Sequence, residues 1–172
     1  MKKAAYLLLL FFFCGAAYAD DDGEREHHKK EHGHSAASVT NPTYEEVCGS
    51  CHFAYQPWLL PSASWKKILA GAEDHYGNAI QMDGGQEKEV AGFLLANAAD
   101  KSSNKRSKKI LKSLDGQVPL RITDVPYIAK KHHDLSRAIL ARPSIAGLQN
   151  CSACHRTAPQ GVYDDDNVIV PP

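Results

Sequence analysis

Two copies of the motif C-x-x-C-H constrain this chain of 172 residues more than any other feature. The pattern attaches haem covalently to a polypeptide. Two thiols three positions apart reach the vinyl groups at one side of the porphyrin, and the histidine that follows lies under the iron. We therefore predict two haem c groups. The attachment residues are Cys48 and Cys51 for the first haem and Cys151 and Cys154 for the second, and the first iron ligands are His52 and His155.

Paired cysteines have two other common uses in proteins. A C-x-x-C pair can form a redox-active disulfide, and four thiols can hold a zinc ion. Neither chemistry requires a histidine directly after each pair, yet both pairs have one. The sequence also predicts export, and thiolate zinc sites favour the reducing cytoplasm. Haem attachment therefore accounts for the cysteines best.

The N-terminal residues 1–19 have the pattern of a secretory signal peptide. Lys2 and Lys3 precede an apolar run from Leu7 to Phe13, and Ala17-Tyr18-Ala19 is a small-x-small cleavage site. The run is too short for a membrane span. We expect cleavage after Ala19, which also removes Cys14, and a periplasmic mature chain without a membrane span.

Residues 20–38 are charged and contain four histidines: His27, His28, His32 and His34. They have too little apolar surface to offset the entropy of ordering. We predict a disordered leader, with weak metal binding by its histidines as the alternative. The chain as a whole has 20 basic and 20 acidic residues, a balance that does not favour nucleic acid as a partner.

The rest of the chain is predicted to be mostly α-helical. Period-3.6 patterns and capping residues predict helices over 43–52, 62–76, 86–99, 104–114 and 124–142. Asp115-Gly116 marks a soft boundary, so we expect an N-terminal haem domain over 39–116 and a C-terminal haem domain over 117–172. The apolar C-terminus, Val168 to Pro171, is expected to form an extended tail packed on the body.

The second ligand of the first iron is either His75 or Met82. On the predicted helix over 62–76, His75 shares the apolar face with Ile68 and Ala72. Met82 is the one methionine besides Met1, and its loop is a plausible ligand loop. We favour His75.

The second ligand of the second iron is either His132 or His133. Adjacent residues on a helix point about 100° apart, and His132 falls between Ile128 and Leu135 on the apolar face. We favour His132. His75 follows His52 by 23 positions, and His132 precedes His155 by 23 positions, so each haem would be held within a local segment.

Several stretches occur in a fixed order over about residues 44–171: Cys48-Gly-Ser-Cys-His-Phe-Ala-Tyr55, Leu60-Pro-Ser-Ala-Ser-Trp65, Asp74-His-Tyr-Gly77, Leu120-Arg-Ile-Thr123, Lys131-His-His-Asp-Leu135 and Asn150-Cys-Ser-Ala-Cys-His155. Together they resemble the dihaem cytochrome c family, the redox partners of the sphaeroides-type high-spin haem protein. The resemblance implies an N-terminal domain similar to class I cytochromes c and a smaller, irregular C-terminal haem domain.

The resemblance also implies two histidine ligands at both irons: His52 with His75, and His155 with the histidine after Lys131, which is His132. The doubled histidine departs from the family pattern, which has a different residue at position 133. A membrane cytochrome b as electron donor and a soluble high-spin haem protein as acceptor follow from the same resemblance.

Two histidines on each iron would leave no open coordination position. We therefore expect a monomeric electron carrier with two low-potential haems, because histidine in place of methionine lowers the reduction potential. The alternative is a dihaem enzyme of the peroxidase kind, or a gas-binding haem protein, with one open iron. The basic segment 101–112 is a candidate docking surface for an acidic redox partner, or simply a solvated helix face.

Overall fold

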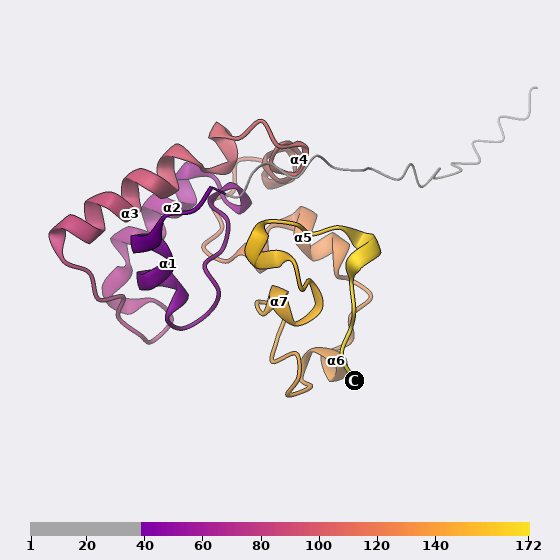
Figure 1. Cartoon of the computed structure of the whole chain (residues 1–172). Coiled ribbons are helices and arrows are strands. Elements are labelled where there is room, and N and C mark those ends of the chain that lie inside the picture. Colours follow the sequence, from indigo (N-terminus) through magenta and orange to yellow (C-terminus); the bar gives the residue numbers. More distant parts are fainter. Residues whose placement is uncertain (1–38) are drawn as a thin grey trace, which may run out of the picture. The chain divides into compact units, whose positions relative to one another are not determined.

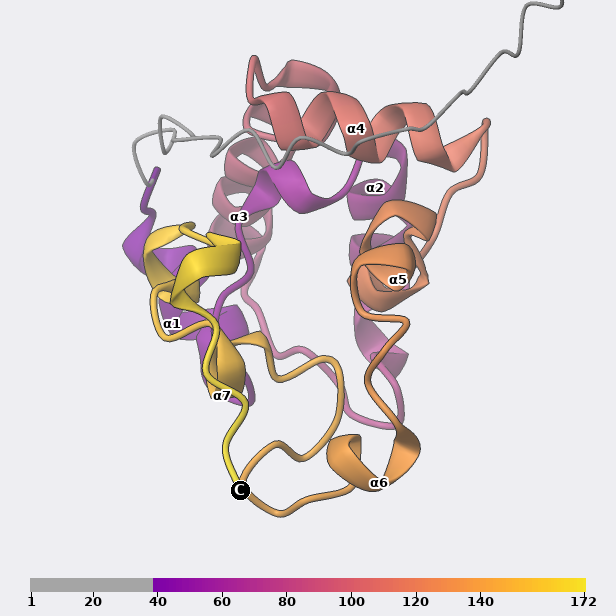
Figure 2. The same cartoon turned by 90° about the vertical axis from the view of Figure 1, so that its right-hand side faces the viewer.

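A computed structural model describes residues 39–172, and the signal peptide and leader predicted over 1–38 lie outside the described residues (Figures 1 and 2). The described part is helical and contains no β-sheet. Its α-helices are α1 (Pro42–Gly49), α2 (Ser62–Ala70), α3 (Gly84–Ala96), α4 (Lys105–Leu114), α5 (Pro126–Lys131), α6 (Arg137–Leu140) and α7 (Cys151–Cys154). Its 3₁₀-helices are Pro57–Leu59, Ala72–Asp74, Ala99–Lys101, Ile122–Asp124, Ala158–Gln160 and Asp165–Asn167.

Over this range, no helix has the length and the apolar composition that a membrane crossing needs.

Side chains cap the first helices. The side chain of Asn41 accepts a hydrogen bond from the backbone N–H of Tyr44, so Asn41 caps α1, which begins one residue before the predicted start. Asp83 caps α3, and Gln86 completes a capping box. Gly84 and Gly85 form its first turn, so α3 begins two residues before the predicted start.

The predicted helix over 62–76 is wrong in its last third. α2 ends at Ala70, and the N–H of Gly71 closes it onto carbonyls of the last turn. A 3₁₀ turn follows, and His75 then lies in a tight turn in which its backbone pairs with that of Asn78. The apolar spacing that suggested a longer helix therefore does not describe the backbone at His75.

The single helix predicted over 124–142 is also wrong. Pro126 begins α5, as expected for proline in a first turn. The helix ends after six residues, with His132 as its C-cap. The side chain of Ser136 then accepts a hydrogen bond from the N–H of Ile139 and starts α6. A serine that can cap a new helix explains the break.

The basic helix was predicted correctly. Asn104 caps α4, and its side chain accepts a hydrogen bond from the N–H of Arg106. Asp115 and Gly116 end it with left-handed backbone, at φ 45° and 80°. α4 packs against α5 and buries Ser107, Ile110 and Leu114, while its lysines face outward.

One hydrophobic core cluster runs through the described residues. Its buried members are Tyr44, Trp58, Leu59, Leu60, Trp65, Val90, Leu94, Ala98, Ile110, Leu114 and Val125. All but Val125 precede the expected boundary after residue 116. Tyr127, Ile128 and Tyr163 pack against the same cluster, so the two expected domains share apolar contacts.

The C-terminal residues form the extended tail that the sequence predicts. Val168 pairs with the backbone of His155, and the N–H of Ile169 donates to the carbonyl of Cys154. Arg142 and Ser144 donate side-chain hydrogen bonds to the carbonyls of Pro171 and Pro172. The tail is therefore tied to the second C-x-x-C-H motif.

Candidate functional site

Both C-x-x-C-H motifs line a cavity of about 930 Å³. Apolar core side chains such as Leu60, Trp65, Leu94 and Ile110 form much of its wall. All four motif cysteines line it, together with four of the five candidate ligand histidines. They are Cys48, Cys51, Cys151, Cys154, His52, His75, His132 and His155. An apolar chamber with a few convergent polar groups is the usual form of a cofactor site.

The first histidine pair is His52 and His75. Their ring centroids are 6.4 Å apart, with planes inclined at 42°. A metal–imidazole bond is about 2 Å long, and the ring centre lies about 1 Å beyond the nitrogen, so two imidazoles on opposite sides of one ion have centres about 6 Å apart. The observed separation matches that spacing. The Nδ1 of His52 also lies 2.8 Å from the carbonyl of Phe53, which orients the ring.

Residues of the second half of the chain hold the turn that carries His75. Tyr76 has φ 56°, a left-handed conformation that costs a non-glycine residue roughly 1 kcal/mol or more. Its hydroxyl donates to the carbonyl of Leu120 at 2.8 Å, and the Arg121 guanidinium lies 3.9 Å above its ring. The Tyr76 ring in turn lies 4.8 Å from that of His75. These contacts offset the backbone strain and fix the turn.

The second histidine pair is His132 and His155. Their ring centroids are 6.1 Å apart, with planes at 75°, again the spacing for one shared ion. The Nδ1 of His132 lies 2.8 Å from the carbonyl of Ile128, so its other nitrogen is left for the cavity. Burial is the main cause that lowers the pKa of both His155 and His75, which favours the neutral imidazole that a metal requires.

The two rival ligands are placed elsewhere. His133 is 70% exposed, and its Nε2 lies 3.0 Å from the carboxylate of Asp134. Met82 packs against the edge of the core cluster. Neither is among the described residues that line the cavity.

Two of the motif cysteines have the character of thiols and not of metal ligands. Burial raises the pKa of Cys48 and of Cys151 to about 11, whereas thiolate ligands sit where the pKa is lowered. Within residues 39–172, no three His, Cys, Asp or Glu side chains converge on one point as ligands of an ion. This chemistry fits covalent attachment of an organic group.

Three tyrosines around the histidines were not predicted. The Tyr55 ring lies 4.8 Å from that of His52, Tyr76 packs on His75, and the Tyr163 ring lies 5.6 Å from that of His155. Each hydroxyl bonds across residue 116, to the Gln149 carbonyl, the Leu120 carbonyl and the Gln56 side chain respectively. Tyr55 and Tyr76 lie within three residues of a predicted ligand histidine in sequence, a signal that could have found them. The sequence around Tyr163 gives no such signal.

The residues present fit two haems. The cavity offers an apolar wall, two pairs of thiols for attachment and two pairs of imidazoles, each pair spaced for one iron. His52 and His155 directly follow their thiol pairs, as the attachment motif requires. When bound, haem supplies one-electron iron chemistry.

Comparison with known proteins agrees with this fit. The sequence profile described as dihaem cytochrome c matches residues 44–163, while no curated protein matches significantly. A dihaem cytochrome c from Rhodobacter sphaeroides is similar in structure, with 33% identity and a TM-score of 0.63, over 74% of this chain and 100% of its own.

A second solved structure is the dihaem cytochrome c from Shewanella baltica, with 29% identity and a TM-score of 0.62, over 76% of this chain and 93% of its own. The profile match and these similarities in fold agree with the two attachment motifs. The chain belongs to the dihaem cytochrome c family, and its cofactors are two covalently bound haem c groups.

Proposed function

We propose that this dihaem c-type cytochrome is a low-potential electron carrier in which two histidines coordinate each iron. The observation that supports this most is the spacing of the two histidine pairs, 6.4 Å for His52 and His75 and 6.1 Å for His132 and His155. Members of the family are typically electron carriers. Two imidazoles on each iron leave no vacant position for oxygen, peroxide or a substrate, so electrons enter and leave without bond formation at the metal.

The ligand set also bears on the potentials. Histidine as second ligand gives a lower reduction potential than methionine, and the protein around each pair keeps the imidazoles in place. Backbone carbonyls lie at hydrogen-bond distance from the Nδ1 of His52 and of His132. Such a bond makes the coordinating nitrogen more basic, which favours the ferric state and lowers the potential further.

We further propose that each haem belongs to its own domain, over 39–116 and 117–172. The first pair, with Cys48 and Cys51, comes entirely from the first range, and the second pair, with Cys151 and Cys154, from the second. The first would be the class I-like domain and the second the small irregular one. The shared core cluster and the tyrosine hydrogen bonds hold the two together.

Contacts between the halves also bring the two haem sites close. The Tyr55 ring packs on His52, and its hydroxyl donates a 2.6 Å hydrogen bond to the carbonyl of Gln149, two residues before Cys151. A ligand of one haem is thus joined to the attachment site of the other through one side chain. This arrangement supports rapid exchange of electrons between the haems.

Optical and EPR spectra of the intact protein test the proposal. Two low-spin ferric signals and a fully low-spin ferrous spectrum are expected, since two imidazoles give each iron a strong, complete ligand field. Carbon monoxide should leave the ferrous spectrum of the native protein unchanged. A high-spin component, or one carbon monoxide bound per protein without denaturation, would instead indicate an open iron and a catalytic or gas-binding protein.

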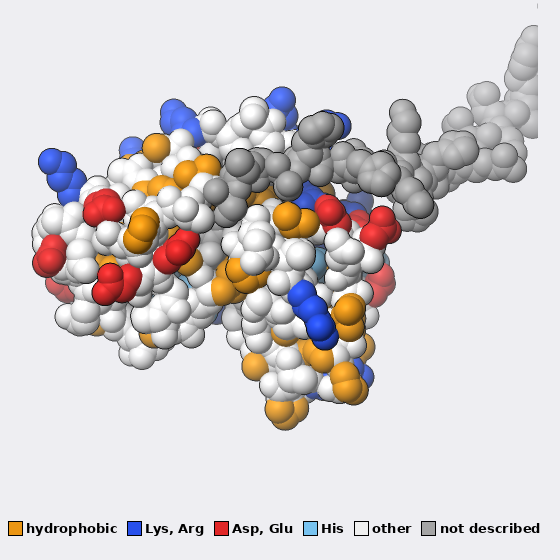
Figure 3. Space-filling model, in the orientation of Figure 1, with side chains coloured by type: hydrophobic (Ala, Val, Ile, Leu, Met, Phe, Trp, Pro, Cys, Tyr) orange, Lys and Arg blue, Asp and Glu red, His pale blue; other side chains and the backbone are white. Residues whose placement is uncertain are grey.

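Location and partners are proposed on the resemblance and on residues 1–19. An exported, periplasmic monomer would accept electrons from a membrane cytochrome b and deliver them to a soluble high-spin haem protein. The family assignment agrees with a redox protein as partner. Figure 3 shows Lys and Arg side chains at several places along the upper edge, and α4 lies at the right-hand end of that edge in Figure 1. This basic helix is the proposed docking surface.

Charge reversal on α4 should slow electron transfer with an acidic partner at low salt. Lys105, Lys108 and Lys112 are exposed, whereas Arg106 pairs with Asp164 and lines the cavity, so Arg106 is left unchanged. Changing the three lysines to glutamate should lower the bimolecular rate about tenfold or more at low ionic strength, because steering charge accelerates encounter. The rate is measured by stopped flow at several salt concentrations.

The control carries the same change in net charge elsewhere. Lys66 and Lys67 on α2 and Lys88 on α3 are also exposed, and their reversal should have a smaller effect. Equal slowing by both sets would show a response to net charge alone and remove α4 as a specific docking surface.

A further inference from the structure

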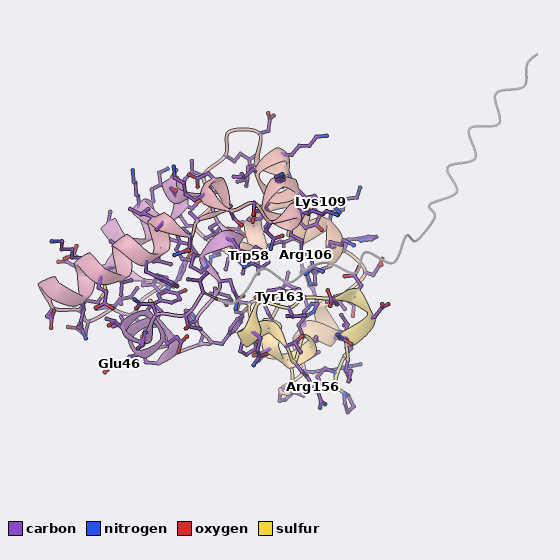
Figure 4. All side chains as sticks on the ribbon, turned by 45° about the horizontal axis from the view of Figure 1, so that its top comes forward. Glu46, Trp58, Arg106, Lys109, Arg156 and Tyr163 are labelled. Carbon is purple, nitrogen blue, oxygen red and sulfur yellow. The ribbon has the colours of Figure 1, made fainter. Side chains whose placement is uncertain are left out.

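Tyr163 links the second histidine pair to the first half of the chain. Its ring lies against the His155 imidazole, with centroids 5.6 Å apart and planes at 63°. The same ring also contacts the indole of Trp58 edge-on, with centroids 5.8 Å apart and planes at 87°. Figure 4 labels Trp58 and Tyr163, which lie close together where the two halves meet. The tyrosine is therefore packed between a core residue and a haem ligand.

Gln56 anchors the hydroxyl of this tyrosine. The glutamine is only 6% exposed, and its Oε1 accepts a hydrogen bond from the Tyr163 hydroxyl. Its Nε2 donates to the carbonyls of Ala158 and Pro159, at 2.7 Å and 3.2 Å. The amide thus uses its donor and its acceptor on the segment that follows the second attachment motif. Such a satisfied buried network specifies one arrangement, because any alternative leaves a polar group unpaired.

Gly161 permits the side chain of Gln56 to approach the backbone of residues 158–163 closely. It has φ 74°, and a Cβ at this position would lie 3.2 Å from the Cγ of Gln56. A larger residue here would both strain the backbone and press on the glutamine. The geometry of the Gln56–Tyr163 pair is therefore built into the backbone of residues 158–163.

The orientation of the His155 ring depends on a packing neighbour more than that of the His132 ring does. A backbone carbonyl lies at hydrogen-bond distance from the Nδ1 of His132, but in the described part of the chain no side-chain hydrogen bond is formed by His155. Its aromatic neighbours are His132 and Tyr163. Packing against Tyr163 therefore constrains the orientation of the His155 imidazole.

We propose that Gln56 and Tyr163 act together as positioning residues for the His155 imidazole, so that a side chain of the first half of the chain tunes the haem held by the second half. The inference rests on the proposed function, because it takes His155 as an iron ligand. Contacts outside the ligand set orient metal-bound imidazoles and tune the metal. The angle between the two imidazole planes then affects both the EPR signal and the potential of that haem.

EPR of the ferric protein with Tyr163→Phe tests the inference. Phenylalanine keeps the ring but loses its anchor. The low-spin signal of the second haem should therefore shift in g-value, with a shift in its midpoint potential, while the signal and potential of the first haem stay as in the wild type. The second haem's signal is assigned as the one that changes in a His132→Met variant.

Gln56→Met gives an independent route to the same result and serves if Tyr163→Phe does not accumulate with two haems. It removes the acceptor while keeping a side chain of similar length. Its shift should match that of Tyr163→Phe, and the double variant should show no additional shift, as expected if the glutamine acts through the tyrosine. Additive shifts would contradict that coupling and overturn the inference.

Tyr44→Phe is the matched control for a purely structural effect. Tyr44 is buried, and its hydroxyl donates a 2.6 Å hydrogen bond to the carbonyl of Tyr55, but its ring packs on Phe93. Both variants should lower the melting temperature by about 2–4 °C, and only Tyr163→Phe should shift the second haem's signal.

If the wild type shows two bis-histidine signals and Tyr163→Phe alters neither, the inference is wrong while the proposed function stands. A wild type without those signals would instead refute the proposed function.

Discussion

Replacing His132 by alanine is expected to convert one of the two ferric haems from low spin to high spin and to let the ferrous protein bind one carbon monoxide. The imidazole of His132 lies 6.1 Å from that of His155, and its Nδ1 is held at the carbonyl of Ile128. Its removal leaves that iron with one protein ligand. EPR and carbon monoxide titration measure both effects.

The neighbouring histidine supplies the control. His133→Ala should leave both low-spin signals intact, because that side chain is exposed and lies against Asp134. The two variants remove the same chemical group one position apart, so they separate coordination from a general loss of histidine. A high-spin signal in His133→Ala, with a normal spectrum in His132→Ala, would reverse the assignment. His132→Met should instead keep a low-spin haem and raise its potential.

Replacing both Cys151 and Cys154 by alanine is expected to prevent stable folding and not merely to remove colour. These thiols attach the second haem, and the cavity for the two haems measures about 930 Å³. Without the second haem, the apolar side chains that line its part of the cavity lose their packing partner and meet water, and each large one costs about 1.5–3 kcal/mol when exposed. A few such side chains together equal the whole stability of a typical domain, about 5–15 kcal/mol.

Far-UV circular dichroism and thermal melting measure this loss. Most helical signal and the cooperative transition should disappear. Ser152→Ala is the control within the same motif: Ser152 donates to the side chain of Asn150 at 3.1 Å, so its loss should lower the melting temperature by only a few degrees. A doubly substituted protein with the wild-type spectrum and melting curve would show that the core does not depend on the second haem.

The sequence predicted those parts of the fold that local chemistry determines. Asn104 and Asp115-Gly116 bounded α4 correctly because caps and left-handed turns are short-range signals. Pro126 marked the start of α5 for the same reason. The haem attachment motifs were equally local, since five consecutive residues contain the whole pattern.

The errors arose where a histidine is placed by tertiary contacts. The apolar periodicity around His75 suggested a helix, yet the chain turns there because Tyr76 is held by Leu120 and Arg121, some 44 residues away in sequence. The pairing of Gln56 with Tyr163 likewise depends on a contact that no short pattern encodes. The break after His132 is different, because the cap at Ser136 that starts α6 is a local signal. Helical spacing pointed to His75 and His132, but neither lies within an α-helix. His75 follows the 3₁₀ turn Ala72–Asp74, and His132 is the C-cap of α5.

The order of the ligands along the chain has a consequence for how the protein is made. His52 comes before His75, whereas His132 comes before His155. A chain synthesised from its N-terminus therefore completes the first attachment motif 23 residues before its second ligand exists. At the second site the reverse holds: α5 and His132 are already present when Cys151 and Cys154 emerge. A haem attached while the chain emerges N-terminus first would therefore find its proposed distal ligand already present only at the second site.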